Sequence, residues 1–242
     1  MLPDTIIHLF KIKIMRLSNY NSLLRIMSVS TSIATLTNIE FCGPSLYFHQ
    51  KALEYQQKEF LSERHIEYVY ATLVAWGMHR MGPNGAKMPN YDEFKESIVA
   101  HKDKLEELRG KRIEYITRNE IDSIIERLSI ICFSIKGSTS NSHLVSGSKT
   151  LAHILPNIVC PMDRQYTLRF FEFRSKDTEN DIFKFVMRSM WDFYQNSNNV
   201  KSVQSLLGQT FNENYPKIFD NLIIEYVKDK LPNEPKKKRK KS

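Results

Sequence analysis

Lys149 and Asp163 are the two residues of this chain whose types and spacing point most directly to chemistry. Residues 146–148 (Ser-Gly-Ser), which precede the lysine, predict a tight turn that leads into a short helix ended by Pro156. The first N–H groups of a helix have no partner within it, so this turn is a candidate cradle for an anion. Lys149 would lie at the mouth of that cradle.

The connection between the short helix and Asp163 decides whether the two groups can meet. Residues 156–162 span about 20 Å when extended. That is enough to run back along a helix of about two turns, which is roughly 10 Å long. Asp163 then stands at the start of the next helix, close to Lys149. The pattern therefore predicts an amine and a carboxylate that face one cleft.

The order of these features resembles that of the helix-hairpin-helix DNA glycosylase superfamily, and this resemblance implies chemistry at a sugar carbon. A lysine attacks carbon only in its deprotonated form, which burial or neighbouring cations favour by lowering its pKa. A carboxylate stabilises the positive charge that develops on the sugar. A base that is to be removed must leave the stack and enter a pocket, for which aromatic walls are expected. Side chains that could form these walls are Trp76, Tyr166, Phe170 and Phe171.

This superfamily contains endonuclease III and the oxoguanine glycosylases, and two short strings of this chain carry the resemblance. The second glycine and the lysine of the family hairpin, L-P-G-V-G-x-K-T-A, match residues 147–150 (Gly-Ser-Lys-Thr). Residues 161–164 (Pro-Met-Asp-Arg) stand where the family has a proline and the catalytic aspartate of its V-D-T-H-V motif. Residues 70–78 take the place of the early core helix, and the resemblance covers about residues 65–175.

The resemblance implies an all-α fold with a helix-hairpin-helix-like element and a base-excision repair glycosylase, with or without AP-lyase activity. Lys149 would form an imine with the sugar, and Asp163 would activate the lysine or stabilise the sugar cation. The partner would be nucleic acid, DNA rather than RNA, and no cofactor or metal is expected. The implied DNA contacts are Ser146, Gly147, Ser148, Thr150 and Arg164, and the implied pocket residues are Trp76, His79, Arg80 and Tyr166.

Departures from the family pattern keep other interpretations open. Val145 replaces the first hairpin glycine, Leu144 stands where proline is usual, and no cysteine-rich iron–sulfur motif follows. A non-catalytic nucleic-acid-binding module is one alternative, and a helical interaction protein is another. Asp163 can also act only as a helix N-cap, and Lys149 only as a solvated residue.

The elements that must position these residues are helices. Hydrophobic residues recur at spacings of three and four almost throughout residues 59–231, and 39–48 is the best, weak candidate for a strand. We expect an all-α fold of eight or more helices, with loops at 82–85 and 137–142. The expected helices lie around residues 66–77, 90–110, 119–132, 148–155, 164–173, 179–195, 200–212 and 215–230.

Composition narrows the remaining possibilities. Three cysteines, widely spaced, exclude a disulfide framework and a CxxC zinc site, and no apolar run approaches the ~18 residues of a membrane-spanning helix. The net charge of +8 comes mostly from the ends, because residues 236–241 carry six positive charges and residues 1–27 a net three. The body is therefore almost neutral, and any nucleic-acid site in it must be a local patch.

Three segments are expected. Residues 1–27 read as a presequence or an over-long gene start, 28–231 as a single helical domain, and 232–242 as a disordered basic tail. The tail sequence PKKKRKK resembles a nuclear-import signal, which predicts a nuclear protein in a eukaryote and a cytoplasmic or nucleoid one elsewhere.

Overall fold

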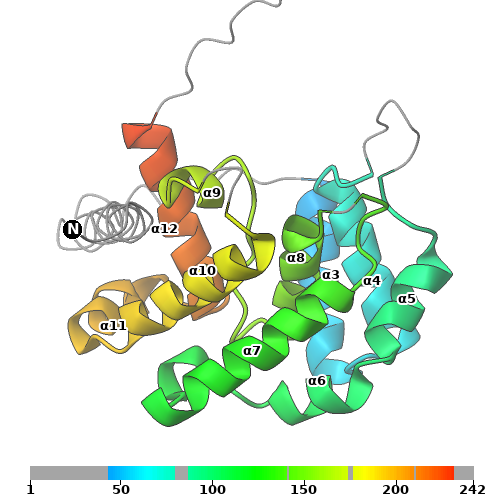
Figure 1. Ribbon diagram of the computed structural model, residues 1–242, viewed down its shortest axis with the longest axis horizontal. Coiled ribbons are helices and arrows are strands. Elements are labelled where there is room, and N and C mark those ends of the chain that lie inside the picture. Colours follow the sequence, from blue (N-terminus) through cyan, green and yellow to red (C-terminus); the bar gives the residue numbers. More distant parts are fainter. Residues whose placement is uncertain (1–42, 80–86, 141, 174–176, 210, 232–242) are drawn as a thin grey trace, which may run out of the picture.

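The computed structural model describes residues 43–79, 87–140, 142–173, 177–209 and 211–231 (Figure 1). Within these ranges the protein is all-α, with ten α-helices and no β-strand, which confirms the predicted fold class. The helices are α3 (Pro44–Lys58), α4 (Glu63–Ala75), α5 (Tyr91–Val99), α6 (Lys102–Leu108), α7 (Arg118–Ser134), α8 (Leu144–Ile154), α9 (Thr167–Phe170), α10 (Glu179–Tyr194), α11 (Ser197–Val203) and α12 (Tyr215–Lys230). Two 3-10 turns, η2 (Ile113–Tyr115) and η3 (Gln204–Leu206), complete the described structure.

Short-range side-chain caps start most of these helices. Asn90 accepts a hydrogen bond from the backbone N–H of Glu93, and α5 therefore begins near the predicted start of the helix expected over 90–110. Thr117 and Glu120 form a reciprocal capping box at the start of α7. Ser62, Thr178, Asn196 and Asn214 cap α4, α10, α11 and α12 in the same manner. Each cap satisfies an N–H group that the helix itself leaves unpaired, which fixes where the helix begins.

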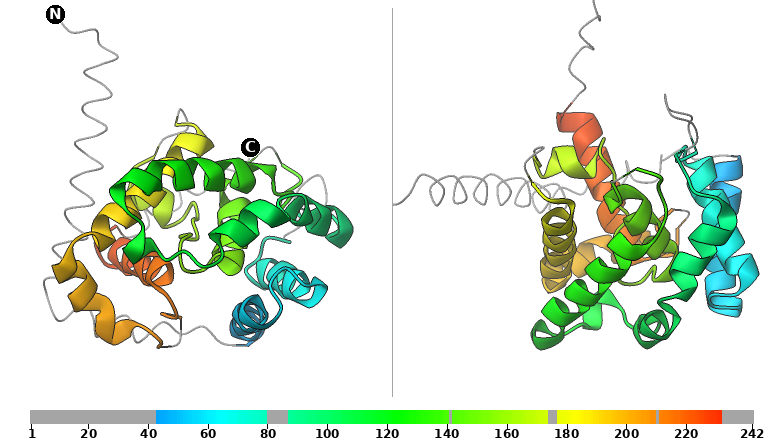
Figure 2. Two further views of the ribbon diagram at one scale, coloured as in Figure 1. Left: turned by 90° about the horizontal axis from the view of Figure 1, so that it is seen from below. Right: turned by 45° about the vertical axis from the view of Figure 1, so that its right-hand side comes forward.

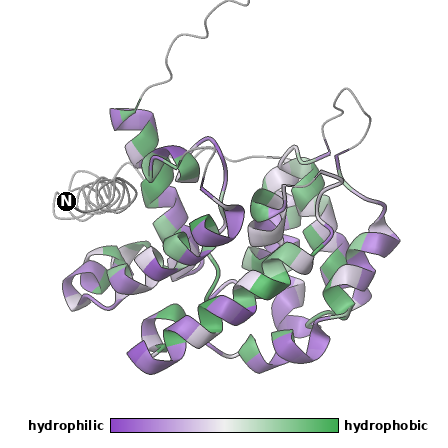
Figure 3. Ribbon diagram, viewed as in Figure 1, coloured by the Kyte–Doolittle hydropathy of each residue, from purple (hydrophilic) through white to green (hydrophobic). Residues whose placement is uncertain are grey.

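Helix α8 lies at the centre of the fold. It contacts α3, α4, α7 and α10. In the ribbon views, α3 and α4 lie to one side of it and α10 and α12 to the other (Figures 1 and 2). Most of its side chains are buried for this reason. The buried apolar side chains of the described helices form one cluster around it, and hydrophobic residues alternate with hydrophilic ones along the surrounding helices (Figure 3).

Four expectations about elements are wrong in detail. Residues 44–48 belong to a helix rather than to the suggested strand near 39–48. The helix expected over 90–110 is divided between α5 and α6. The helix expected over 164–173 is reduced to the single turn of α9, and the helix expected over 200–212 ends at Val203 and continues as a 3-10 turn.

Several expectations lie outside the described residues. These are the presequence over 1–27, the basic tail over 232–242, the turn at 82–85 and the pocket residue Arg80. The loop expected at 137–142 is confirmed except at 141, which is not described. In the part of the chain that the structure describes, no helix combines the length and apolar character needed to cross a bilayer.

Candidate active site

Lys149 projects from the central helix α8 and is half-buried. Its amine Nζ lies 5.5 Å from the ring centroid of Trp76, the residue that ends α4. A cation over an indole face is attracted by the ring quadrupole. The contact between α4 and α8 therefore places the lysine against the aromatic side chain that the sequence predicts as a pocket wall.

Asp163 reaches the same region because its connector folds back onto α8. The N–H of Met162 donates to the hydroxyl oxygen of Ser148 over 3.1 Å. This hydrogen bond joins the residue that precedes Asp163 to the residue that precedes Lys149. The Asp163 N–H donates to Thr167 Oγ1, and its Oδ1 accepts from the N–H of Tyr166 over 2.7 Å. Asp163 thus caps the turn that leads into α9, and the predicted doubling back of the chain is confirmed.

A cavity of about 530 Å³ brings the two groups together. Its lining contains Asp163 and three of the four predicted pocket residues, Trp76, His79 and Tyr166, and the fourth, Arg80, is not described. The His79 side chain is held at the end of α4 by a 2.6 Å contact from its Nδ1 to the carbonyl of Val74. The full lining is Ser45, Ala75, Trp76, Gly77, His79, Lys149, Pro161, Met162, Asp163, Tyr166, Lys217, Asp220 and Ile224.

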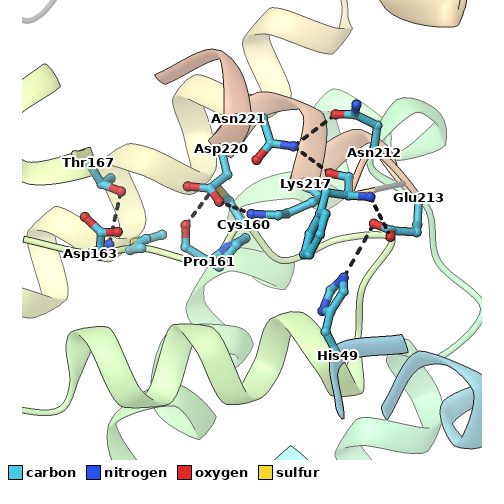
Figure 4. A network of polar contacts seen from close by, with 12 residues as sticks. His49, Cys160, Pro161, Asp163, Thr167, Asn212, Glu213, Lys217, Asp220 and Asn221 are labelled. Atoms are coloured by element: carbon cyan, nitrogen blue, oxygen red, sulfur yellow. Dashed lines mark hydrogen bonds and ion pairs between the residues drawn. The ribbon is translucent and has the colours of Figure 1, made fainter. Parts of the chain in front are cut away.

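The same cavity contains an ion pair that the sequence analysis missed. Lys217 and Asp220 lie on α12, and their Nζ and Oδ2 atoms are 2.6 Å apart (Figure 4). Both residues are buried, at 7% and 5% exposure. The Lys217 amine lies 5.9 Å from the ring centroid of Trp76, so two amines share one indole ring. The spacing of three residues on a helix was the available signal, but such pairs are usually solvated.

Burial and charge shift the pKa values of this cluster. Burial lowers the pKa of Lys149; Lys217 acts in the same direction, while the carboxylates of Asp163 and Asp220 oppose it. Burial raises the pKa of Asp220, against the lowering effect of Lys217. A buried amine whose pKa is lowered holds a larger deprotonated fraction near neutral pH, which is the form that acts as a nucleophile.

The expected hairpin is absent, and its residues do not form a surface. Residues 146–148 lie inside α8 rather than in a turn, and Ser146, Ser148 and Thr150 are at most 1% exposed. The hydroxyl of Thr150 donates to the carbonyl of Ser146, and the hydroxyl of Ser148 donates to that of Val145. These side chains are therefore inaccessible to DNA, and the predicted contacts by Ser146, Gly147, Ser148 and Thr150 are wrong.

Gly147 serves helix packing. A Cβ at this position would lie 2.2 Å from the carbonyl oxygen of Cys132 on α7, so only glycine permits the close approach of α7 and α8. The N-terminus of α8 is also filled. Glu179 accepts hydrogen bonds from the N–H groups of His143 and Leu144, over 2.8 and 3.0 Å. A protein carboxylate thus occupies the position where an external anion was expected.

Of the remaining candidate residues, two phenylalanines lie in the core and one arginine lies at the surface. Phe170 and Phe171 are fully buried in the core and do not line the cavity. Arg164 is exposed and donates to the hydroxyl of Ser142 over 2.6 Å, so its contact with nucleic acid stays a prediction. No group of three or more histidine, cysteine or acidic side chains in the described ranges is placed to hold a metal ion.

Comparison with known proteins gives no family for this chain. No protein-family model matches it, and neither curated proteins nor solved structures give a significant match. Its function must therefore be argued from the cavity itself.

Proposed function

We propose that this protein is an enzyme that uses Lys149 as an amine nucleophile on a sugar carbon of damaged DNA, as an N-glycosylase with AP-lyase activity. The observation that carries the proposal is the shared cavity of Lys149 and Asp163. The lowered pKa of Lys149 supports the role of a nucleophile. The half-buried Asp163 uses Oδ1 to cap a turn, which leaves Oδ2 without a hydrogen-bond partner among the described residues.

The proposed chemistry follows from these two groups. The neutral amine of Lys149 attacks C1′ of the deoxyribose, a C–N bond forms, and the base departs with the electrons of the glycosidic bond. Asp163 stabilises the positive charge that builds on the sugar ring. Opening of the ring gives a protonated imine between Lys149 and C1′. Loss of a C2′ proton from this imine then expels the 3′ phosphate, which is the lyase step.

The dimensions and walls of the cavity are compatible with a flipped nucleoside. Its volume of about 530 Å³ falls within the range of small-molecule sites, roughly 300–1,000 Å³. Trp76 and Tyr166 supply aromatic surface in its lining, and an extruded base is commonly held by such side chains. The exposed Arg164, next in sequence to Asp163, is available to a phosphate of the backbone.

The two alternative functions predict different contacts. A non-catalytic helix-hairpin-helix module needs an accessible hairpin backbone, whereas residues 146–148 are buried within α8. Their burial favours the enzyme over the module. A helical interaction protein has no need for a half-buried amine that lines the same cavity as a carboxylate. The experiment below distinguishes this alternative from the enzyme.

The test is covalent trapping with borohydride on DNA duplexes that carry an abasic site, uracil or oxoguanine. Borohydride delivers a hydride to the imine and converts it into a stable secondary amine, so protein and DNA become crosslinked. We expect the wild-type chain to be trapped on at least the abasic duplex. Lys149→Met should lose trapping, and Lys228→Met, which replaces an exposed lysine of α12, should retain it.

Each other outcome has a definite meaning. Trapping that survives in Lys149→Met and disappears in Lys217→Met would transfer the nucleophile to Lys217. Binding without trapping, weakened by salt, would support the module, because phosphate contacts release counterions. The absence of both binding and trapping would leave the helical interaction protein.

A further inference from the structure

A row of polar contacts between buried and partly buried side chains starts at the backbone of Lys149. His153 on α8 places its Nδ1 atom 2.8 Å from the backbone carbonyl oxygen of Lys149. Its other ring nitrogen, Nε2, lies 2.9 Å from Nδ1 of His49 on α3. The remaining nitrogen of His49, Nε2, lies 3.5 Å from Oε2 of Glu213 (Figure 4). We name Glu213, His49 and His153 the histidine chain.

Hydrogen-bond directions fix most of the protons in this chain. A carbonyl oxygen only accepts, so His153 Nδ1 must carry a proton. Burial first, and the neighbouring His49 second, hold the pKa of His153 well below its ordinary value, so its Nε2 is bare and accepts. His49 Nδ1 must therefore donate. The other ring nitrogen of His49, Nε2, faces Oε2 of Glu213. A carboxylate oxygen, like a carbonyl oxygen, only accepts hydrogen bonds.

That last contact requires a proton. Two bare acceptors 3.5 Å apart would repel each other, and neither atom forms a hydrogen bond within the described part of the chain. The other oxygen of Glu213, Oε1, accepts from the N–H of Phe211, as expected of a carboxylate. Burial raises the pKa of Glu213, but its contacts with His49 and with backbone N–H groups outweigh this, and the pKa is lowered overall.

We propose that His49 carries a proton on each ring nitrogen and forms an ion pair with Glu213, and that the histidine chain positions the Trp76 ring and the turn of α8 that carries Lys149. The chain reaches from the backbone of Lys149 to a second cavity of about 460 Å³, which Glu213 helps to line. Its positioning role rests on the proposed function, whereas its protonation pattern does not.

The rings around His49 support the positioning role. The Trp76 ring lies 5.0 Å from His153 and 5.7 Å from His49, measured between ring centroids, so the wall of the active-site cavity rests on both histidines. Phe211 stacks on His49 from the opposite segment, at 5.4 Å. Displacement of either imidazole would therefore move the indole that contacts the Lys149 amine.

The other ionisable groups near the chain have assignable states. His65 on α4 accepts from the N–H of Leu61 through Nδ1 and contacts the carbonyl of His153 through Nε2. Burial lowers the pKa of His65 to about 4, so it is neutral with its proton on Nε2. The cations nearest to the histidine chain on α8 and α12 are Lys149 and Lys217, and the amine of each lies over the Trp76 ring.

Nitrogen-15 NMR of the full chain, labelled at histidine, tests the protonation pattern. At pH 7 we expect three different signatures. His49 should show two protonated ring nitrogens, His153 a single proton on Nδ1, and His65 a single proton on Nε2. A neutral His49 in the wild-type chain at pH 7 would overturn the ion pair.

Glu213→Gln tests the pairing with nearly unchanged shape. The amide can donate to a bare Nε2, so His49 should change to the neutral signature while the fold is retained. Glu54→Gln is the matched control, because Glu54 lines the same second cavity but pairs with the lysines Lys51 and Lys58. His49 should stay doubly protonated in this control. A doubly protonated His49 in Glu213→Gln would also overturn the pairing.

The positioning role has its own readout. Hydrogen exchange of the α8 amides and the rate of Lys149 methylation by formaldehyde and borohydride should each change at least about threefold in Glu213→Gln, and neither should change in Glu54→Gln. If His49 becomes neutral in Glu213→Gln while the exchange and methylation rates stay constant, the histidine chain does not position Lys149. None of these measurements uses DNA, so a failure of the proposed repair activity would leave their outcomes readable.

Discussion

Replacing Lys217 by methionine should raise the pKa of the Lys149 amine by about one unit or more. The two amines lie 5.5 and 5.9 Å from one ring centroid, so the distance between them is below about 12 Å. At an effective dielectric constant of about 20, two like charges about 12 Å apart repel by about 1.4 kcal/mol, which equals about one pKa unit. A shorter separation increases the effect.

The opposite change comes from the other member of the ion pair. Asp220→Asn removes a carboxylate that favours the charged form of Lys149, so the pKa of the amine should fall further. The double variant Lys217→Met/Asp220→Asn removes both influences and should return the pKa towards the wild-type value. Opposite shifts from two adjacent residues are difficult to produce by a general loss of structure.

The assay is competitive labelling of lysines over a range of pH, with the peptide containing Lys149 quantified by mass spectrometry. The midpoint of its labelling curve reports the pKa of the amine and requires no substrate. Breaking a buried ion pair from one side costs about 3 to 5 kcal/mol. Thermal unfolding of each variant is therefore measured first, and labelling is done well below the melting temperature.

One result would refute the reasoning. If both single variants are folded and shift the midpoint in the same direction, or if neither shifts it, the Lys217–Asp220 pair does not control the Lys149 amine.

Two further predictions concern the helix that carries Lys149. Gly147→Ala should destabilise the protein by about 1 to 3 kcal/mol, because the new methyl group would overlap the Cys132 carbonyl on α7; unchanged urea unfolding would contradict this packing. Glu179→Gln should cost about 1 kcal/mol at pH 7, because it removes a negative charge from the start of α8. Burial raises the pKa of Glu179, but hydrogen bonds from Ser142, Leu144 and His143 lower it overall, to below the ordinary value of 4.5. The stabilisation is thus complete above pH 4.5 and declines as the pH falls through the lower folded-state pKa. The difference in unfolding free energy between wild type and variant should shrink from pH 7 to pH 3, and a constant difference would argue against the charge effect.

Local sequence was sufficient for several features. The all-α class follows from hydrophobic spacing, and the Asn90 cap from a side chain that reaches an N–H three residues away. The return of the connector to α8 follows from the position of Pro156 and the length of the segment after it. In each case the interacting groups are near in sequence, or the chain between them is short enough to restrict its path.

Other features depended on contacts between distant segments. Residues 146–148 favour a turn by composition, yet packing of Gly147 against α7 and burial of the serine hydroxyls keep them helical. Lys217 and Asp220 look like a solvated pair in the sequence, and only the packing of α12 buries the pair and places the Lys217 amine over the Trp76 ring. His49 and His153 are 104 residues apart and meet only because α3 packs on α8. The sequence alone determined pairings between groups that lie close together along the chain. The tertiary structure decided which polar groups lose their contact with water, because burial depends on the segments that pack around a residue rather than on its neighbours in sequence.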